Sequence, residues 1–216
     1  MPRPPRPFDA IILAGGRGAR MGGVDKPGLV VGDRTLLGSV LAAVGAAGAS
    51  RAVVVGPRRP GWPPPGRPRA SGRPGPLISY AQEEPAGAGP GPALRCGLAE
   101  IAAPVALLLA ADLPFLRDRH LAWLLAALDS EPERAGVVLA DEGGRPQWLA
   151  SCWRTAVLRA AAGGYPGRSL RGLLGPLGPR QLRYDRAGAG PPPWLDCDTP
   201  EDLTRARAWS EQEASR

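Results

Sequence analysis

The residues best suited to chemistry lie in one stretch near the start of the chain. Residues 11–26 read IILAGGRGARMGGVDK, so an apolar, strand-like segment runs into a series of glycines and ends on Lys26. Glycine turns allow backbone N–H groups to approach phosphate oxygens without interference from a Cβ atom. Arg17, Arg20 and Lys26 surround the turn, and Lys26 is the only lysine among the 27 Lys and Arg residues. The stretch therefore predicts a site for a phosphate-bearing ligand.

Two widespread phosphate-binding loops do not match this stretch. A Walker A loop requires G-x-x-x-x-G-K-[ST], but here Lys26 follows Asp25 and precedes Pro27. The dinucleotide fingerprint G-x-G-x-x-G begins at Gly16 but has Met21 in place of its third glycine. The loop is thus neither of these two types.

The elements that must position this loop alternate along the chain. Short apolar runs predict strands, and apolar residues at helical spacing predict helices. The expected strands are 8–14, 52–56, 76–82, 105–111, 136–140 and a further one at 146–154, which runs into an expected helix at RTAVLRAAA. The other expected helices are 35–47, 92–102, 118–129 and 199–213. Continuous apolar strands that alternate with helices predict an α/β fold with a mainly parallel sheet and helices on both faces.

Size and composition favour one globular domain. The chain has 216 residues, of which 44% are hydrophobic and 22% charged, close to globular averages. We expect a single domain over residues 8–213, a disordered N-terminus at 1–7 and a flexible Pro/Gly/Arg-rich loop at 57–76. No apolar run reaches the about 20 residues that span a bilayer, and no signal-type segment is present. We therefore expect a soluble, cytoplasmic protein without membrane contact.

The basic charge and the scarcity of Cys and His limit the function classes. The net charge is +7, but the arginines are scattered through loops, with no basic helix and no interleaved aromatic residues. This distribution favours small anionic substrates over nucleic acid. The 3 cysteines lie far apart and there is 1 histidine, which argues against a disulfide framework and a structural zinc site. His120 lies in an expected helix, and we predict that it faces solvent without a functional role.

The first motif closely resembles a family signature. LAGGRGARMGGVDK matches L-A-G-G-x-x-x-R-M-G-x-x-D-K of the nucleotidyltransferases that make molybdenum cofactor dinucleotides, the MobA-type family. Three further segments resemble family motifs and stand in the same order. Residues 83–98 resemble the acidic and G-G-P segment that faces base and ribose, and residues 107–116 resemble the D-[LM]-P strand that holds the metal. Residues 196–203 resemble the closing motif D-x-[DN]-T-P-x-D-L. Pro90 interrupts the G-G-P pattern of residues 83–98. The resemblance implies a Rossmann-like, doubly wound fold.

The resemblance also implies a reaction and its residues. The reaction is transfer of GMP from GTP to the phosphate of molybdopterin, with release of pyrophosphate and with Mg²⁺ as cofactor. Molybdoenzymes or cofactor-delivery proteins are the implied protein partners. The catalytic residues would be Lys26, Arg20 and Asp112, and Asp112 would also be the metal ligand. The pterin-binding residues would be Asp196 and Asp198. The nucleotide-binding residues would be Leu13, Ala14, Gly15, Gly16, Gly18, Lys26, Glu84, Gly91 and Asp112. Whether Glu84 or its neighbour Glu83 contacts the nucleotide stays open.

Alternatives accompany several of these assignments. Asp112 could instead cap the helix at 118–129, although Asp118 is better placed for that role. Asp198 could cap the last helix or serve the site, either as a second metal ligand or in pterin binding. Gly15 leaves room for a purine and favours guanine, but a molybdopterin cytidylyltransferase and a phospholactate guanylyltransferase remain alternatives. So does a non-catalytic protein that binds nucleotides or nucleic acid.

Overall fold

A computed structural model describes residues 6–15, 24–58, 75–184 and 190–215 of the chain. Its elements, in chain order, are β1 (Phe8–Leu13), the 3₁₀ turn η2 (Lys26–Gly28), β2 (Val30–Val31), β3 (Arg34–Thr35), α1 (Leu36–Ala47), β4 (Arg51–Val55), β5 (Leu77–Ala81), α2 (Pro90–Glu100), β6 (Val105–Ala110), α3 (Asp118–Asp129), β7 (Gly136–Ala140), β8 (Pro146–Arg154), α4 (Thr155–Gly164), α5 (Leu170–Leu174), the 3₁₀ turn η3 (Gly175–Leu177), β9 (Arg180–Arg183) and α6 (Pro200–Ala214).

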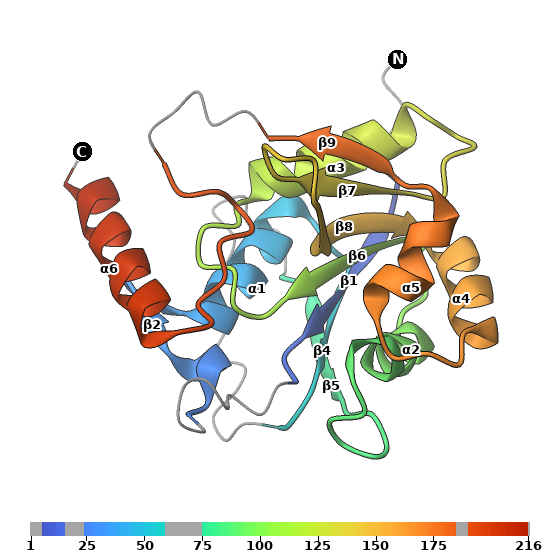
Figure 1. The fold of residues 1–216 in the computed structure, drawn as a ribbon, viewed down its shortest axis with the longest axis horizontal. Helices are drawn as coiled ribbons and strands as arrows, with labels where there is room; N and C mark the ends of the chain where they lie inside the picture. Colours follow the sequence, from blue (N-terminus) through green and yellow to red (C-terminus); the bar gives the residue numbers. More distant parts are fainter. Residues whose placement is uncertain (1–5, 16–23, 59–74, 185–189, 216) are drawn as a thin grey trace.

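Seven of the described strands form one twisted sheet with helices on both faces (Figure 1). The strand order is β5-β4-β1-β6-β8-β7-β9, and β1, β4, β5 and β6 run parallel to one another. β8 is antiparallel to its neighbours β6 and β7, whereas β7 and β9 are parallel. The expectation of a mainly parallel, doubly wound α/β sheet is confirmed.

The two faces of the sheet carry separate cores. Within β1, Ile12 packs with α1 and α3 on one face, and its neighbour Ile11 packs with α2, α4 and α5 on the other. Successive side chains of a strand point to opposite faces, so a central strand must be apolar throughout. This requirement explains the mainly apolar run FDAIIL in β1 and the apolar run VALLLA in β6, whose residues are all buried. The one charged member, Asp9, accepts at Oδ2 from the amides of Ala102 and Ala103, each at 2.9 Å.

A third, smaller core holds the C-terminal helix against the short hairpin of β2 and β3. Its buried members are Val31, Leu36, Phe115, Cys197, Leu203 and Ala206. Trp209 of α6 meets the ring of Phe115 edge-on, with 6.1 Å between ring centroids. Arg207 Nε donates to the carbonyl of Val30 at 3.0 Å, which fixes α6 to the hairpin. This small core brings the segment before α6 next to the segment before the hairpin.

Several elements differ from the sequence-based expectation. The β2–β3 hairpin, α5 and β9 were not expected, and α2 begins at Pro90 rather than at residue 92. The three missed elements span only 2 to 5 residues per helix or strand, too few for a hydrophobic period to show. Proline fits the first turn of a helix, so Pro90 can start α2 instead of interrupting it.

The start of α3 corrects two predictions. Asp118 is the first helical residue, and the N-cap is Arg117. His120 does not face solvent: it is 4% exposed, and its Nδ1 accepts a hydrogen bond from the amide of Arg117 at 3.1 Å. The ring of Tyr184, which follows β9, meets the imidazole edge-on at 5.6 Å. The histidine is buried because a distant strand end covers this face of α3.

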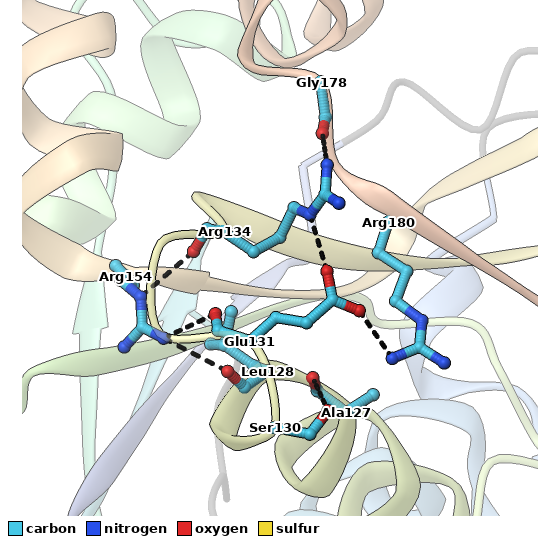
Figure 2. A network of polar contacts seen from close by, with 8 residues as sticks. All are labelled: Ala127, Leu128, Ser130, Glu131, Arg134, Arg154, Gly178 and Arg180. Carbon is cyan, nitrogen blue, oxygen red and sulfur yellow. Dashed lines mark hydrogen bonds and ion pairs between the residues drawn. The ribbon is translucent and has the colours of Figure 1, made fainter.

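An arginine-rich network closes the sheet edge at which β7 and β9 begin (Figure 2). The Arg154 guanidinium donates to the carbonyls of Leu128, Glu131 and Arg134 at 3.0–3.1 Å and so satisfies the end of α3. The Glu131 carboxylate binds Arg134 and Arg180, and Arg134 above all lowers the pKa of this glutamate. A shallow surface pocket lies beside these residues. The network is opposite the carboxyl ends of the parallel strands, and we assign it a structural role.

Among the described residues, no helix combines the length and apolar character needed to cross a bilayer.

Arg6 pairs with Asp129 of α3, at 3.3 Å between Nε and Oδ1. Residues 1–5 of the expected N-terminal tail and 59–74 of the expected loop lie outside the described residues.

Candidate active site

The carboxyl ends of the parallel strands meet at one edge of the sheet, where open α/β sheets bind their ligands. The carbonyl of Leu13 accepts from the amide of Ala111 at 3.0 Å, and the amide of Ala14 donates to the carbonyl of Val55 at 2.8 Å. These backbone groups of Leu13 and Ala14 are therefore engaged with neighbouring strands. Gly15 is the first exposed residue after β1 and begins the glycine loop.

Gly56, at the end of β4, brings a second chain segment against this loop. A Cβ atom on Gly56 would lie 2.8 Å from the carbonyl carbon of Ala14, and its φ of +146° belongs to a region that glycine favours. Only glycine fits this approach without a shift of the backbone. The loop therefore leaves the sheet from a tightly defined starting point.

Lys26 joins two aspartates that are distant in sequence. Its Nζ forms an ion pair with Oδ2 of Asp112 and lies 2.5 Å from Oδ1 of Asp198. Asp112 follows β6 by two residues, and Asp198 precedes α6. The side chains of Lys26 and Asp112 are only 15% and 17% exposed, whereas that of Asp198 is 45% exposed. The structure thus brings three predicted site residues together at the carboxyl edge of the parallel strands.

The charges of this cluster act on one another. Burial alone would lower the pKa of Lys26, but the carboxylates of Asp112 and Asp198 outweigh it and raise that pKa above its ordinary value. Asp196 lies close by: its partial removal from water, and then the charges of Asp198 and Asp112, raise its pKa. Among the described residues, the ammonium of Lys26 thus acts on three carboxyl groups of this cluster.

The capping alternatives for both aspartates are wrong. The N-cap of α6 is Thr199, whose hydroxyl accepts from the amide of Asp202 at 3.1 Å while the Asp202 carboxylate accepts from the Thr199 amide at 3.0 Å. The N-cap of α3 is Arg117, five residues beyond Asp112. Neither Asp112 nor Asp198 is therefore required as a helix cap.

The two glutamates after β5 have different surroundings. Glu84 is exposed, whereas Glu83 is 6% exposed and its Oε1 accepts from the amide of Gly87 at 2.9 Å. Oε2 of Glu83 is buried without a hydrogen-bond partner among the described residues. A Cβ atom on Gly15 would lie 3.7 Å from Oε1, so the carboxylate lies over the start of the glycine loop.

A signal for Glu83 was present in the sequence. Ala81 packs into the core on the α2 side of the sheet, and Glu83 follows it by two residues in the chain. Side chains two apart along an extended segment point to the same side. That periodicity selects Glu83 over Glu84 as the residue turned inward.

The second glycine segment is held by a distant loop. The amide of Gly91 donates to the carbonyl of Arg168 at 2.8 Å, and a Cβ on Gly91 would lie 3.0 Å from that oxygen. Gly91 therefore allows the chain before α5 to pack on the first turn of α2, and its amide is engaged there. The remaining predicted residues of the site, Gly16, Gly18 and Arg20, lie outside the described residues.

The residues present fit a divalent cation. Among the described residues, no group of three or more His, Cys, Asp or Glu side chains is arranged to hold a metal. Asp112 and Asp198, however, direct one carboxylate oxygen each at a single positive charge, the ammonium of Lys26. Magnesium in nucleotide enzymes is held by one or two carboxylates together with phosphate oxygens and water. The pair would supply the protein's share of such a ligand set.

A family comparison defines the class of this protein. The model of the MobA-like NTP transferase domain matches residues 10–183, and the chain belongs to this family. No curated protein matches the sequence significantly.

Solved structures agree with this family. Molybdopterin-guanine dinucleotide biosynthesis protein A from Archaeoglobus fulgidus superposes with a TM-score of 0.65 at 17% identity, covering 94% of this chain and 99% of its own. 2-C-methyl-D-erythritol 4-phosphate cytidylyltransferase from Thermus thermophilus gives 0.64 at 21% identity, covering 95% and 99%. The Rv0371c protein of Mycobacterium tuberculosis, in complex with manganese, gives 0.62 at 21% identity, covering 94% and 98%. At these identities the likeness concerns the fold.

Proposed function

We propose that this nucleotidyltransferase transfers GMP from GTP to the phosphate of molybdopterin. One observation carries the proposal: Lys26, at the end of the family's glycine-loop motif, meets Asp112 and Asp198 at the carboxyl edge of the sheet. Each of these three residues comes from a different motif of the resemblance, and the fold brings them to one point.

The reaction needs alignment and charge neutralisation more than acid–base chemistry. A phosphate oxygen of the acceptor attacks the α-phosphorus of GTP, the bond from that phosphorus to the bridging oxygen breaks, and pyrophosphate leaves. The attacking phosphate is already ionised at neutral pH, so no general base is required. Lys26 and Arg20 would bind the phosphate oxygens on which charge develops. A site without histidine is adequate for this chemistry.

The proposed cofactor is Mg²⁺, with Asp112 as the principal ligand and Asp198 as the second. When bound, the metal would neutralise phosphate charge and orient the triphosphate. Asp196 and the outer face of Asp198 are the residues that we assign to the pterin substrate. Asp196 is exposed beside the cluster, where a second substrate can approach it.

Guanine is the base that the site favours. Gly15 leaves space next to the strand end, and Glu83 presents a buried carboxylate oxygen without a partner among the described residues. The Watson–Crick edge of guanine offers two adjacent N–H donors, N1–H and N2–H₂, to such an acceptor. Cytosine offers one amino group beside two acceptors, so a carboxylate pairs with it less well. We therefore assign the base contact to Glu83 in preference to Glu84.

The direct test is pyrophosphate release by the purified protein with molybdopterin, Mg²⁺ and each of GTP, CTP, ATP and UTP. We expect release with GTP that depends on molybdopterin, together with formation of the guanine dinucleotide. Turnover with CTP in preference to GTP would make the protein a cytidylyltransferase. Turnover with phospholactate instead of molybdopterin would replace the acceptor. Pyrophosphate release with none of these pairs would overturn the proposal.

A further inference from the structure

The ammonium of Lys26 lies where a divalent cation would have to bind. Its Nζ contacts Oδ2 of Asp112 and Oδ1 of Asp198, the two carboxylate oxygens that converge in the site. A cation held by the same two oxygens would come within a few ångströms of that nitrogen. Because like charges repel strongly at short range in a partly buried site, the two cations cannot share this position.

We propose that Lys26 and the metal are mutually exclusive partners of the Asp112–Asp198 pair, and that the triphosphate of the nucleotide exchanges one for the other. Without nucleotide, Lys26 neutralises the pair and keeps free divalent cations out. When the triphosphate arrives, its oxygens offer the ammonium a new anionic partner, and the carboxylates become available to the metal. The inference rests on the proposed function for the identity of the nucleotide, but the exclusion itself is a property of these three side chains.

The local structure allows this exchange. Lys26 stands at the first position of η2, a single 3₁₀ turn, and reaches the aspartates with a flexible four-carbon stem. The side chain of Asp198 is 45% exposed, so the pair can be reached from solvent once the ammonium leaves. Asp196, two residues before Asp198, adds a third carboxyl group to this edge, and a divalent cation would balance more of this negative charge than one ammonium does.

Binding of Mn²⁺ to the nucleotide-free protein tests the exchange. The free ion is counted by electron paramagnetic resonance, a readout independent of turnover. We expect Lys26→Met to bind Mn²⁺ on the order of tenfold more tightly than the wild type, within the usual range of coupling between sites. Lys26→Gln should behave in the same way, and Lys26→Arg, which keeps the charge, should stay as weak as the wild type. The added substitution Asp198→Asn in Lys26→Met should abolish the gain.

Arg34→Met is the matched control. It also removes one positive charge, from an exposed side chain of the β2–β3 hairpin whose ion-pair partner is Asp33, at 3.9 Å. This variant should bind Mn²⁺ as weakly as the wild type, because a general change in net charge does not vacate the aspartate pair. Thermal melts of each variant identify any that do not fold.

A non-hydrolysable GTP analogue completes the test. It should tighten Mn²⁺ binding to the wild type by a larger factor than to Lys26→Met, because in that variant no ammonium needs to be displaced. Equal Mn²⁺ affinity of Lys26→Met and Arg34→Met would overturn the inference, as would weaker binding by Lys26→Met or binding by no variant. Failure of the GTP and molybdopterin assay with a normal Mn²⁺ result would overturn the proposed substrates alone.

Discussion

Asp198 and Thr199 are adjacent in the chain, but their side chains have different partners. Asp198 Oδ1 binds the ammonium of Lys26 at 2.5 Å, whereas the Thr199 hydroxyl accepts from the amide of Asp202 at 3.1 Å and donates to its carboxylate at 2.9 Å. One residue thus belongs to the charged cluster and the next to the cap of α6. Substitutions at Asp198 and at Thr199 therefore test the charged cluster and the helix cap separately.

We predict that Asp198→Asn lowers turnover at least tenfold without lowering the melting temperature, because it removes a charge from the cluster. A loss of this size corresponds to about 1.4 kcal/mol of transition-state stabilisation. Thr199→Ala should instead destabilise the fold by about 1 kcal/mol, the usual value of an N-cap, and keep nearly normal turnover. Paired melts and steady-state rates check both. The reverse pattern would mean that Asp198 is structural.

We predict that Asp112→Asn lowers turnover on the order of a thousandfold while the protein stays folded, since it removes the principal carboxylate for the metal. Asp118→Asn is the control: Asp118 is an exposed residue at the start of α3, outside the cluster. Rates measured at saturating GTP and Mg²⁺, with melting curves alongside, distinguish loss of chemistry from loss of fold. Near-normal turnover of Asp112→Asn would remove this residue from the site.

We predict that Glu83→Gln weakens the use of GTP more than Glu84→Gln does. The amide can still accept from Gly87, but it replaces one acceptor oxygen at the buried position by a donor group. An unmatched polar group of this kind costs about 1–3 kcal/mol, or roughly tenfold to a hundredfold in kcat/KM. Glu84→Gln, at an exposed position, should have kcat/KM for GTP near the wild-type value. Equal effects of the two variants would contradict the assignment of Glu83.

The shape of Lys26 also matters to the reaction. We predict that Lys26→Arg and Lys26→Ala both lose most turnover, and that Lys26→Arg retains the higher affinity for GTP. The guanidinium keeps the charge but is wider and planar, whereas the ammonium is compact and can follow a phosphate oxygen. Nucleotide affinity and single-turnover rates give the two quantities separately. Wild-type rates in both variants would place Lys26 outside the catalytic machinery.

The buried histidine gives the fold a pH dependence. Burial, followed by the charges of Arg119 and Arg117, lowers the pKa of His120 from 6.5 to about 4. The unfolded chain therefore binds a proton at higher pH than the folded protein, so this contribution to stability is complete above pH 6.5 and is lost as the pH falls towards about 4. The upper limit of the loss is about 3 kcal/mol.

We predict that urea unfolding shows a steeper loss of stability between pH 6.5 and 4 in the wild type than in His120→Gln. Glutamine does not titrate, and its side-chain oxygen can accept the amide hydrogen bond that Nδ1 of His120 accepts from Arg117. Comparing the slopes cancels the contributions of the acidic groups, which both proteins share. Parallel stability curves would show that His120 does not titrate in this window.

The sequence by itself determined the sheet and predicted the side chains of a candidate site. Apolar runs such as those of β1 and β6 are typical of strands inside a sheet that is covered on both faces, and the carboxyl ends of parallel strands share one edge. Asp112 follows β6 by two residues, and Lys26 ends the glycine loop that begins after β1, so both were expected near the carboxyl ends of the parallel strands. The motif at 196–203 left Asp198 open between the site and the cap of the last helix, and the structure showed its contact with Lys26.

Only the tertiary structure decided which neighbouring residue faces inward and what its partners are. Thr199, not Asp198, caps α6. The burial of His120 depends on Tyr184 beyond β9, and the position of α6 depends on the small core around Phe115. Glu83, not Glu84, turned out to be buried over Gly15. These outcomes depend on contacts between segments far apart in the chain. A local pattern carries no information about such contacts, because their free energy appears only when both segments are packed together.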